Sequence, residues 1–301
     1  MNAINLQEAL AGHRILLAGA GGQVGVALQQ VMPEGVKLLA LDRNALDITD
    51  RKAVAEAVNR IRPDWVINAA AYTAVDKAES EPELAFAINR DGAKHLAQAA
   101  ADINARMVQI STDYVFDGEQ ARPYAPGDPV NPINVYGESK LAGEVVTREA
   151  LGDRALILRT AWVYAPHGHN FLLTMLRLMR ERDELRIVED QVGTPTSAHS
   201  LANAIVAAMA RNVTGTQHWT DAGAASWYDF ACAIGELAEI AGFTFGACRV
   251  TPIPTSSYPT PARRPVSSLL DKQTMRNAIG DDGVHWKKAL RQAVTRVIDL
   301  S

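Results

Sequence analysis

Short apolar runs and segments with helical spacing alternate along the first half of the chain. The apolar runs, which we predict to be strands, cover residues 14–18, 36–41, 65–71, 106–110 and 155–158. Between them, helical spacing and helix-start signals predict helices over 26–32, 50–60 and 82–103, and a further helix that contains Tyr136. Strands that alternate with helices indicate an α/β fold, a doubly wound parallel sheet of the Rossmann type.

Beyond Tyr164 the alternation is less regular. Helical spacing predicts amphipathic helices over 171–182, 197–211, 227–241 and 285–298, with a short strand over 185–188. Residues 251–265 are too rich in proline for regular structure, and we predict that they form a clamp or lid. We expect a dinucleotide-binding Rossmann domain over 1–165 and a smaller α+β, mainly substrate-binding part over 166–301, interleaved with the Rossmann sheet.

A glycine-rich turn, Gly19-Ala20-Gly21-Gly22-Gln23-Val24-Gly25, directly follows the first predicted strand. Glycines permit a tight turn and let backbone N–H groups at a helix start approach a pyrophosphate. The spacing Gly-x-x-Gly-x-x-Gly is a variant of the commoner dinucleotide fingerprint. The second predicted strand is followed by Asp42, where a carboxylate can hold the adenosine ribose, whereas Arg43 could face a 2′-phosphate. We predict a site for NADH or NADPH.

Small, polar or aromatic residues stand at the carboxyl ends of three further predicted strands, where ligands of doubly wound sheets bind. Residues 69–71 are all alanine and leave room for a flat ligand against the backbone. Thr112 and Asp113 follow the strand over 106–110, and each could contact a substrate or only satisfy the local backbone. Trp162 follows the strand over 155–158, where its ring could lie against a sugar or a base, or belong to the core.

The predicted helix that contains Tyr136 also contains Lys140, four residues further on. On a helix the two side chains lie on one face. A phenol is a poor acid or base near neutrality unless a neighbouring cation favours its phenolate. Lys140 is such a cation, and it could also bind a ribose hydroxyl of a cofactor. Because the glycine turn and Thr112 fall at the same edge of the predicted sheet, we interpret Tyr136 and Lys140 as a catalytic pair.

Composition limits the partners of the chain. Its 301 residues are 48% hydrophobic and 21% charged, with a formal net charge of −4, so nothing favours nucleic acid or an anionic membrane. An anionic substrate needs local basic residues, and we predict that Arg263, or its neighbour Arg264, binds a pyrophosphate. The two cysteines have no metal-ligand or disulfide spacing. With no signal peptide or membrane-spanning run in view, we expect a cytoplasmic protein.

Six segments carry a resemblance to a known family. They are GQVG (22–25), AAAYTAVDKAE (69–79), STDYVF (111–116), NVYG (134–137), RTAWVY (159–164) and PTSSYPTPARRP (254–265). On these segments the chain resembles the extended short-chain dehydrogenase/reductases, and most closely the family of dTDP-4-dehydrorhamnose reductases. The first and fourth segments are shared across the superfamily, whereas the other four are specific to this branch.

The resemblance implies that NADPH or NADH reduces the C4 ketone of a dTDP-4-dehydro-6-deoxy sugar, in the last step of dTDP-L-rhamnose synthesis for cell-surface polysaccharide. It implies that Tyr136 is the proton donor, that Lys140 lowers the pKa of Tyr136 and holds the nicotinamide ribose, and that Thr112 completes the catalytic set. Together with the glycine turn, the expected cofactor-binding residues are Gly19, Gly22, Gln23, Val24, Gly25, Asp42, Asp47, Ile48, Ala71, Tyr72, Thr73, Tyr136 and Lys140. The expected substrate contacts are Thr112, Asp113, Trp162 and Arg263.

One position departs from the family. Relatives often carry Glu where this chain has Ala27, and that Glu is linked to a Mg²⁺-assisted dimer. Because an alanine side chain supplies no ligand, we do not expect a metal at this position, and a homodimer is left open.

Two other functions stay open. The first is a sugar-nucleotide epimerase or dehydratase of the same fold. Sugar-nucleotide 4,6-dehydratases typically have a sequence similar to Thr-Asp-Glu from the position of Thr112 onward, whereas this chain has Tyr114 in place of the Glu. The second is a non-catalytic dinucleotide-binding regulatory subunit, which would not need Thr112, Tyr136 and Lys140 together. These residues therefore favour the reductase.

Overall fold

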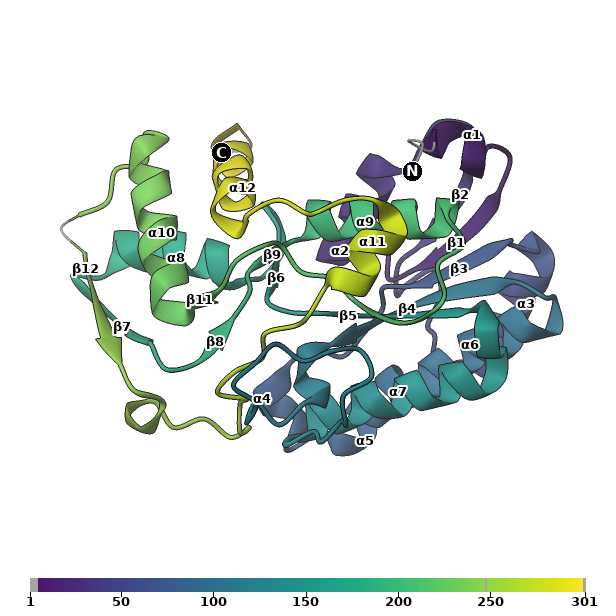
Figure 1. Cartoon of the computed structure of the whole chain (residues 1–301), viewed down its shortest axis with the longest axis horizontal. Helices are drawn as coiled ribbons and strands as arrows, with labels where there is room; N and C mark the ends of the chain where they lie inside the picture. The colour runs from purple at the N-terminus through teal and green to yellow at the C-terminus, as the bar shows by residue number, and fades with distance from the viewer. Residues whose placement is uncertain (1–4, 247, 300–301) are drawn as a thin grey trace.

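A parallel sheet of six strands forms the larger lobe of the computed structural model, which describes residues 5–246 and 248–299 (Figure 1). The strand order is β10-β5-β4-β3-β1-β2, and every neighbouring pair is parallel. The strands are β1 (Arg14–Ala18), β2 (Lys37–Leu41), β3 (Trp65–Asn68), β4 (Arg106–Thr112), β5 (Ala155–Thr160) and β10 (Gly215–His218). The predicted doubly wound α/β sheet is confirmed.

Helices cover both faces of this sheet. One face carries α2 (Gln23–Val31) and α9 (Ala198–Ala210), flanked by α1 (Leu6–Leu10) and α11 (Gln273–Ile279). The other face carries α3 (Arg51–Ile61), α6 (Ala93–Asp102) and α7 (Val135–Leu151). Alternate residues of β1 enter the two cores, Ile15 on the α2 face and Leu16 on the α3 face, because successive strand side chains point to opposite sides.

The predicted helix over 82–103 is continuous but not uniform. It begins with α5 (Pro82–Phe86), passes through the π-helical turn η1 (Ala87–Gly92) and continues as α6. Proline at the first position fits a helix start, since its missing N–H has no partner there in any case. The preceding connection contains α4 (Val75–Ala78), and the 3₁₀ turns η2 (Asp113–Val115) and η3 (Gly152–Arg154) follow β4 and α7.

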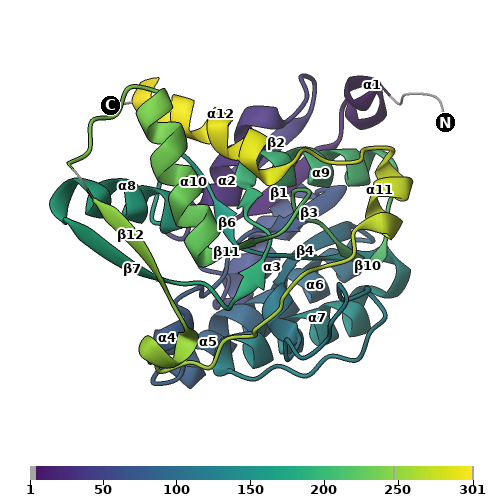
Figure 2. The same cartoon turned by 60° about the vertical axis from the view of Figure 1, so that its left-hand side comes forward.

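A smaller lobe lies beside the carboxyl ends of the strands (Figure 2). Its apolar core joins α8 (Phe171–Glu181), α10 (Trp227–Ile240) and α12 (Trp286–Asp299). The parallel pair β7 (Glu184–Val188) and β12 (Arg249–Ile253) packs against α10. The remaining elements are β6 (Val163–Tyr164), β8 (Val192–Gly193), β9 (Thr196–Ser197), β11 (Ala225–Ser226) and the 3₁₀ turn η4 (Thr255–Ser257).

Two features of the later chain differ from the sequence pattern or extend it. The expectation of irregular structure over 251–265 is wrong at its start, because β12 pairs with β7 over 249–253 and accommodates Pro252 in a two-stranded sheet. The chain also returns to the large lobe, since α9, β10 and α11 all lie on the main sheet. The division of roles between 1–165 and 166–301 stays a prediction. Over 5–246 and 248–299, every helix is too short or too polar to cross a bilayer.

Candidate active site

A pocket of about 340 Å³ opens at the carboxyl ends of β1, β2 and β3. Six of the predicted cofactor-binding residues form its wall together with other residues of the same loops. The lining residues are Gly19, Gly21, Gly22, Asp42, Arg43, Asn44, Leu46, Asp47, Ile48, Ala69, Ala70, Ala71 and Ile88. The pocket thus lies where ligands of doubly wound sheets bind.

The glycine turn is shaped by two close backbone approaches. Gly19 has a φ of +81°, and a side chain there would collide with the backbone of Ala70. A Cβ on Gly25 would collide with the carbonyl oxygen of Gly19, so α2 can start close to β1 only with glycine at this position. At Gly21 and Gly22 the nearest atoms to an added Cβ are 3.7 and 3.4 Å away, which leaves space above the helix start.

The first turn of α2 fits an anionic ligand. Its N-cap is Gly22, and no side chain satisfies the free N–H groups of the helix start. Such N–H groups and the helix dipole attract a phosphate or pyrophosphate. The side chain of Gln23 points towards the smaller lobe. There its amide oxygen accepts a hydrogen bond of 2.8 Å from Asn170, the N-cap of α8. The residues present therefore fit a dinucleotide through backbone groups.

Two carboxylates hold the loops beside this turn. Asp42 Oδ1 accepts hydrogen bonds from the backbone N–H groups of Asn44 and Ala45 at 3.0 and 2.9 Å. Asp47 Oδ1 accepts from the backbone and the hydroxyl of Thr49 at 2.9 and 2.8 Å, and these bonds lower the pKa of Asp47. Because each carboxylate keeps its other oxygen free of these bonds, both loops can still accept a hydrogen bond from a ribose.

The π turn η1 links the edge of the 340 Å³ pocket to α7. Asn89 accepts a 2.9 Å bond from the Tyr72 backbone N–H, and its amide donates to the Tyr72 carbonyl and to the Ser139 hydroxyl at 3.1 and 2.9 Å. The Tyr72 hydroxyl donates to Glu81 at 2.6 Å, which raises the pKa of Tyr72 to about 12. Thr73 is exposed beside them. Sequence reasoning missed Asn89, because a π turn carries no signal in the 3.6-residue period.

The start of α7 brings Tyr136 to the end of β4. Asn134 caps the helix by accepting a 2.8 Å bond from the Gly137 N–H. A Cβ on Gly137 would collide with the Tyr114 carbonyl oxygen, so glycine is needed for this close approach. The Tyr136 ring packs edge-on against the Tyr114 ring, with centroids 5.5 Å apart. The hydroxyl of Tyr136 lies close to the Thr112 hydroxyl, which lowers the pKa of Tyr136.

Burial dominates the protonation of the catalytic pair. Desolvation raises the pKa of Tyr136 to about 12, and the hydrogen bond with Thr112 lowers it only in part. Lys140 Nζ donates a 2.6 Å bond to the Ile110 carbonyl, and burial lowers the pKa of Lys140 to about 8. Burial is the larger effect on the pKa of Tyr136, and the expected lowering of this pKa by Lys140 stays a prediction. A phenol that stays protonated can donate a proton.

Asp113 is a second buried acid at this point. Its side chain is 1% exposed, and its Oδ1 accepts a 3.0 Å bond from the Thr112 hydroxyl. Burial raises the pKa of Asp113 to about 6, while the nearby hydroxyls of Ser268 and Thr112 oppose the shift. Asp113 Oδ2 has no partner in the described part of the chain. The arrangement places an acceptor directly behind the Thr112 hydroxyl.

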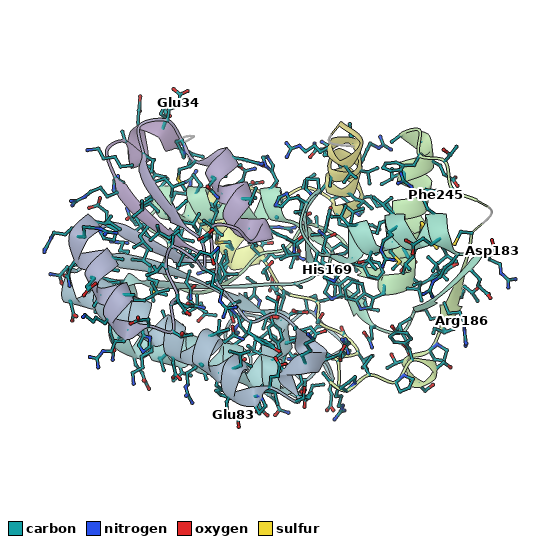
Figure 3. All side chains as sticks on the ribbon, turned by 180° about the vertical axis from the view of Figure 1, so that it is seen from behind. Glu34, Glu83, His169, Asp183, Arg186 and Phe245 are labelled. Carbon is teal, nitrogen blue, oxygen red and sulfur yellow. The ribbon has the colours of Figure 1, made fainter. Side chains whose placement is uncertain are left out.

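A second cavity, of about 710 Å³, lies in the smaller lobe and reaches Asp76 and Arg264. Its walls come from α8, β7, the start of α10 and the segment around η4, including Phe171, Arg186, Gln191, Trp227 and Tyr258. Figure 3 places Arg186 on the smaller lobe and His169 near the junction of the two lobes. Sequence reasoning missed most of these residues, because they come from separate elements that only the fold brings together.

Trp162 supports this cavity through another aromatic ring. It stacks on Trp227 with ring centroids 3.5 Å apart and an interplanar angle of 8°, and Trp227 lines the cavity. The backbone of Trp162 has a φ of +48°, a conformation that is costly for a large side chain. A Cβ on Gly193 would lie 2.6 Å from the indole, so this neighbour has no room for a side chain.

The two predicted arginines point to different surroundings. The Arg263 side chain is 71% exposed and lies 3.9 Å from Glu119, while its carbonyl oxygen accepts a bond from Asn134. The Arg264 side chain is 21% exposed, lines the 710 Å³ cavity and makes two bonds to Asp76 at 2.9 and 2.8 Å. Arg264 is thus the arginine at the cavity, and the substrate contact of Arg263 stays a prediction.

The position of Ala27 bears on the metal question. Ala27 is 3% exposed and belongs to the apolar core between the sheet and α9. In the residues 5–246 and 248–299, no three His, Cys, Asp or Glu side chains form a group that could hold a metal ion.

Comparison with known proteins identifies close relatives over almost the whole chain. The family model described as "RmlD substrate binding domain" matches residues 13–298. The dTDP-4-dehydrorhamnose reductase of Escherichia coli K12 is 44% identical over 294 residues, which cover 93% of this chain and 98% of that protein.

Solved structures agree with this result. The crystal structure of a dTDP-4-dehydrorhamnose reductase from Clostridium acetobutylicum has a TM-score of 0.88 and 43% identity, and covers 95% of this chain and 99% of that one. The enzyme of the same name from Bacillus anthracis, solved in complex with NADP, has a TM-score of 0.89 and 36% identity over 94% of this chain and 99% of its own.

Proposed function

The chain belongs to the dTDP-4-dehydrorhamnose reductase family, and from this premise we propose that it reduces the C4 ketone of dTDP-4-dehydro-β-L-rhamnose to give dTDP-L-rhamnose. NADPH or NADH is the reductant, held at the 340 Å³ pocket by the glycine turn and the loops of Asp42 and Asp47. The dTDP-sugar occupies the 710 Å³ cavity, with Arg264 at its pyrophosphate.

The observation that carries the proposal is the position of Tyr136. It packs against the apolar cluster of Tyr72, Ala78 and Ala85, and Ala71, the neighbour of Tyr72, lines the 340 Å³ pocket. On another side it contacts Tyr114, which lies beside Arg264 at the edge of the larger cavity. Tyr136 thus lies at the junction of the two sites, where a reduced nicotinamide and a sugar ketone would meet.

The residues of the chain supply the proton and the placement. When bound, the cofactor supplies a hydride to the ketone carbon. Tyr136 gives its phenolic proton to the ketone oxygen as negative charge develops there, and later regains a proton from solvent. The Thr112 hydroxyl can donate to the same oxygen if it leaves Asp113. Lys140, four residues further along α7 than Tyr136, carries positive charge and can bind the ribose.

A spectrophotometric assay tests this function. Purified protein, dTDP-4-dehydro-β-L-rhamnose and either NADPH or NADH should show loss of reduced-nicotinamide absorbance, and the product should have the stereochemistry of L-rhamnose. No oxidation of either cofactor would contradict the proposal. Tightly retained NAD⁺ in the purified protein, with conversion of the sugar but no net oxidation, would instead indicate an epimerase or a dehydratase.

We also propose that the enzyme acts in the cytoplasm. The absence of a disulfide or metal pattern for Cys232 and Cys248 supports a reducing compartment. Light scattering after size-exclusion chromatography measures the oligomeric state and decides between a monomer and a homodimer.

A further inference from the structure

A buried ion pair lies one helical turn beyond Lys140. Glu144 is 0% exposed and Arg159, on β5, is 3% exposed. Arg159 Nε donates to Glu144 Oε1 at 2.8 Å and Nη2 donates to Oε2 at 2.7 Å, so the pair has two parallel bonds. The Ser111 hydroxyl donates a third bond to Glu144 Oε1 at 2.6 Å.

These bonds fasten α7 to two strands in register with the catalytic residues. Lys140 bonds to Ile110 and Glu144 bonds to Ser111, which are consecutive residues of β4, and Thr112 is the next residue. Ser111 pairs with Arg159 across β4 and β5, so the arginine completes the connection from the neighbouring strand. Two successive turns of α7 are thus attached to the two residues of β4 that directly precede Thr112.

Glu144 also determines the charge around the Lys140 ammonium. Burial disfavours that ammonium, and Glu144 is the charged group that favours it. Among the other titratable groups, Arg148 on α7 lies 3.7 Å from Glu144 but is half exposed. His218 on β10 lies 3.5 Å from Arg159, and burial lowers the pKa of His218 to about 3, so it is neutral.

Other charged groups near α7 lie on neighbouring elements. Asp113 of η2 acts on Tyr136 rather than on Lys140. Glu79, which follows α4, accepts a bond from the backbone N–H at the first residue of α7. On η1 the uncharged Asn89 donates a hydrogen bond to the Ser139 hydroxyl of α7. Glu144 is therefore the acid that faces Lys140.

Buried ion pairs rarely stabilise a fold more than apolar residues of the same size would. A role in the reaction accounts better for a charged pair at this place. We propose that Glu144 and Arg159 are positioning residues: they fix the catalytic helix on β4 and β5, and the Glu144 carboxylate keeps Lys140 an ammonium during turnover. This inference rests on the proposed function, since it assigns the pair a role in the same reaction.

The first test compares variants of Glu144 by the pH dependence of kcat/KM. Glu144→Gln keeps the shape of the side chain but removes its charge, so the alkaline limb should move down by about one pH unit, with about tenfold less turnover on that limb. Glu144→Asp keeps the charge and should keep the limb near its wild-type position. Glu149→Gln removes an exposed charge from the same helix and is the matched control.

The second test does not depend on turnover. NMR titration of ¹³Cε-labelled lysine, with the Lys140 signal assigned by its loss in Lys140→Met, gives the midpoint of that ammonium directly. The midpoint should fall in Glu144→Gln. It should return towards wild type in Glu144→Gln/Arg159→Gln, which removes both charges and leaves no unpaired ion to disturb folding.

The outcomes separate the two proposals. Equal loss of activity in Glu144→Gln and Glu144→Asp, with the Lys140 midpoint unchanged in the single and the double variant, would overturn the inference and leave only structural support. A wild-type protein that turns over no sugar nucleotide would contradict the proposed function, whereas the lysine titration would still decide the role of Glu144.

Discussion

Arg264 and Asp76 are 188 residues apart in the sequence and form an ion pair with two hydrogen bonds, of 2.9 and 2.8 Å. The pair attaches the proline-rich segment after η4 to the connection that follows β3. Burial opposes the charge of Arg264, but the hydrogen bonds to Asp76 and the other neighbouring groups together raise its pKa, and the guanidinium lines the larger cavity. The Asp76 carboxylate fixes the direction of the Arg264 guanidinium, so Arg264 is oriented before a substrate binds.

Replacement of Arg264 by alanine should weaken binding of the sugar nucleotide. A charge-assisted, partly buried hydrogen bond contributes about 1.5–3 kcal/mol, so KM for the substrate should rise about tenfold or more. KM for the reduced cofactor should change little, because its pocket is on the other side of Tyr136. Arg263→Ala is the matched control, since it removes the neighbouring, 71% exposed arginine. Equal effects of the two variants would contradict the assignment of Arg264.

Removal of the Tyr136 hydroxyl should abolish most turnover. Tyr136→Phe keeps the ring that packs against Tyr114 but takes away the proton donor, so kcat should fall about 100-fold or more. Binding of NADPH, followed by the fluorescence of its nicotinamide, should survive, because the glycine turn is unchanged. Near-normal turnover in this variant would exclude Tyr136 as the donor.

Arg43 should decide part of the cofactor preference. It lines the cofactor pocket beside Asp42, where its guanidinium can bind the 2′-phosphate of NADPH. In Arg43→Ala we expect KM for NADPH to rise about tenfold, with KM for NADH within about twofold of wild type. Arg51→Ala, which removes an exposed arginine at the start of α3, is the control. A parallel rise in KM for both cofactors would show that Arg43 does not contact the 2′-phosphate.

Lys140 should reduce the stability of the fold at neutral pH. Its pKa is about 8 in the folded protein against 10.5 for a free side chain. Below pH 8 the lysine is charged in the folded and in the unfolded state, and the folded state bears the cost of burying the charge. Between pH 8 and 10.5 the unfolded chain binds more protons than the folded protein, so the free energy of unfolding rises with pH. Lys140→Met should therefore be about 1–3 kcal/mol more stable at pH 7, although less active.

Urea unfolding of both proteins at several pH values measures this difference. The gain of Lys140→Met over wild type should shrink as the pH rises from 8 to 10.5, because the wild-type lysine loses its charge in that interval. A variant that is less stable than wild type at pH 7 would show that the bond to Ile110 outweighs the cost of burial.

The sequence indicated the edge of the sheet at which the site lies, because apolar runs that end in glycine, alanine or threonine mark the carboxyl ends of strands. For that reason the positions of Gly19, Thr112 and Tyr136 agree with the predicted convergence at this edge. The roles of these residues remain predictions. The larger cavity was not predictable, since it combines elements as distant as α8 and η4.

Other features lack a sequence signal for physical reasons. The directions of the Arg263 and Arg264 side chains depend on which of them binds Asp76. The residue that binds, Arg264, is 188 positions away from Asp76 in the sequence. The π turn at Asn89 inserts a change of period that apolar spacing does not report. Glu144 appears on the sequence as an ordinary helical acid, because its partner Arg159 is supplied by a neighbouring strand.

The late position of β10 has a consequence for biosynthesis. Every residue that lines the cofactor pocket has been made before β4 leaves the ribosome, but the sheet gains its last strand only when residues 215–218 emerge. Until then β5 presents a row of free backbone N–H and C=O groups, and such an edge is a template for pairing with other chains. A nascent chain halted before residue 215 should therefore aggregate or recruit chaperones, even though its nucleotide-binding loops are complete.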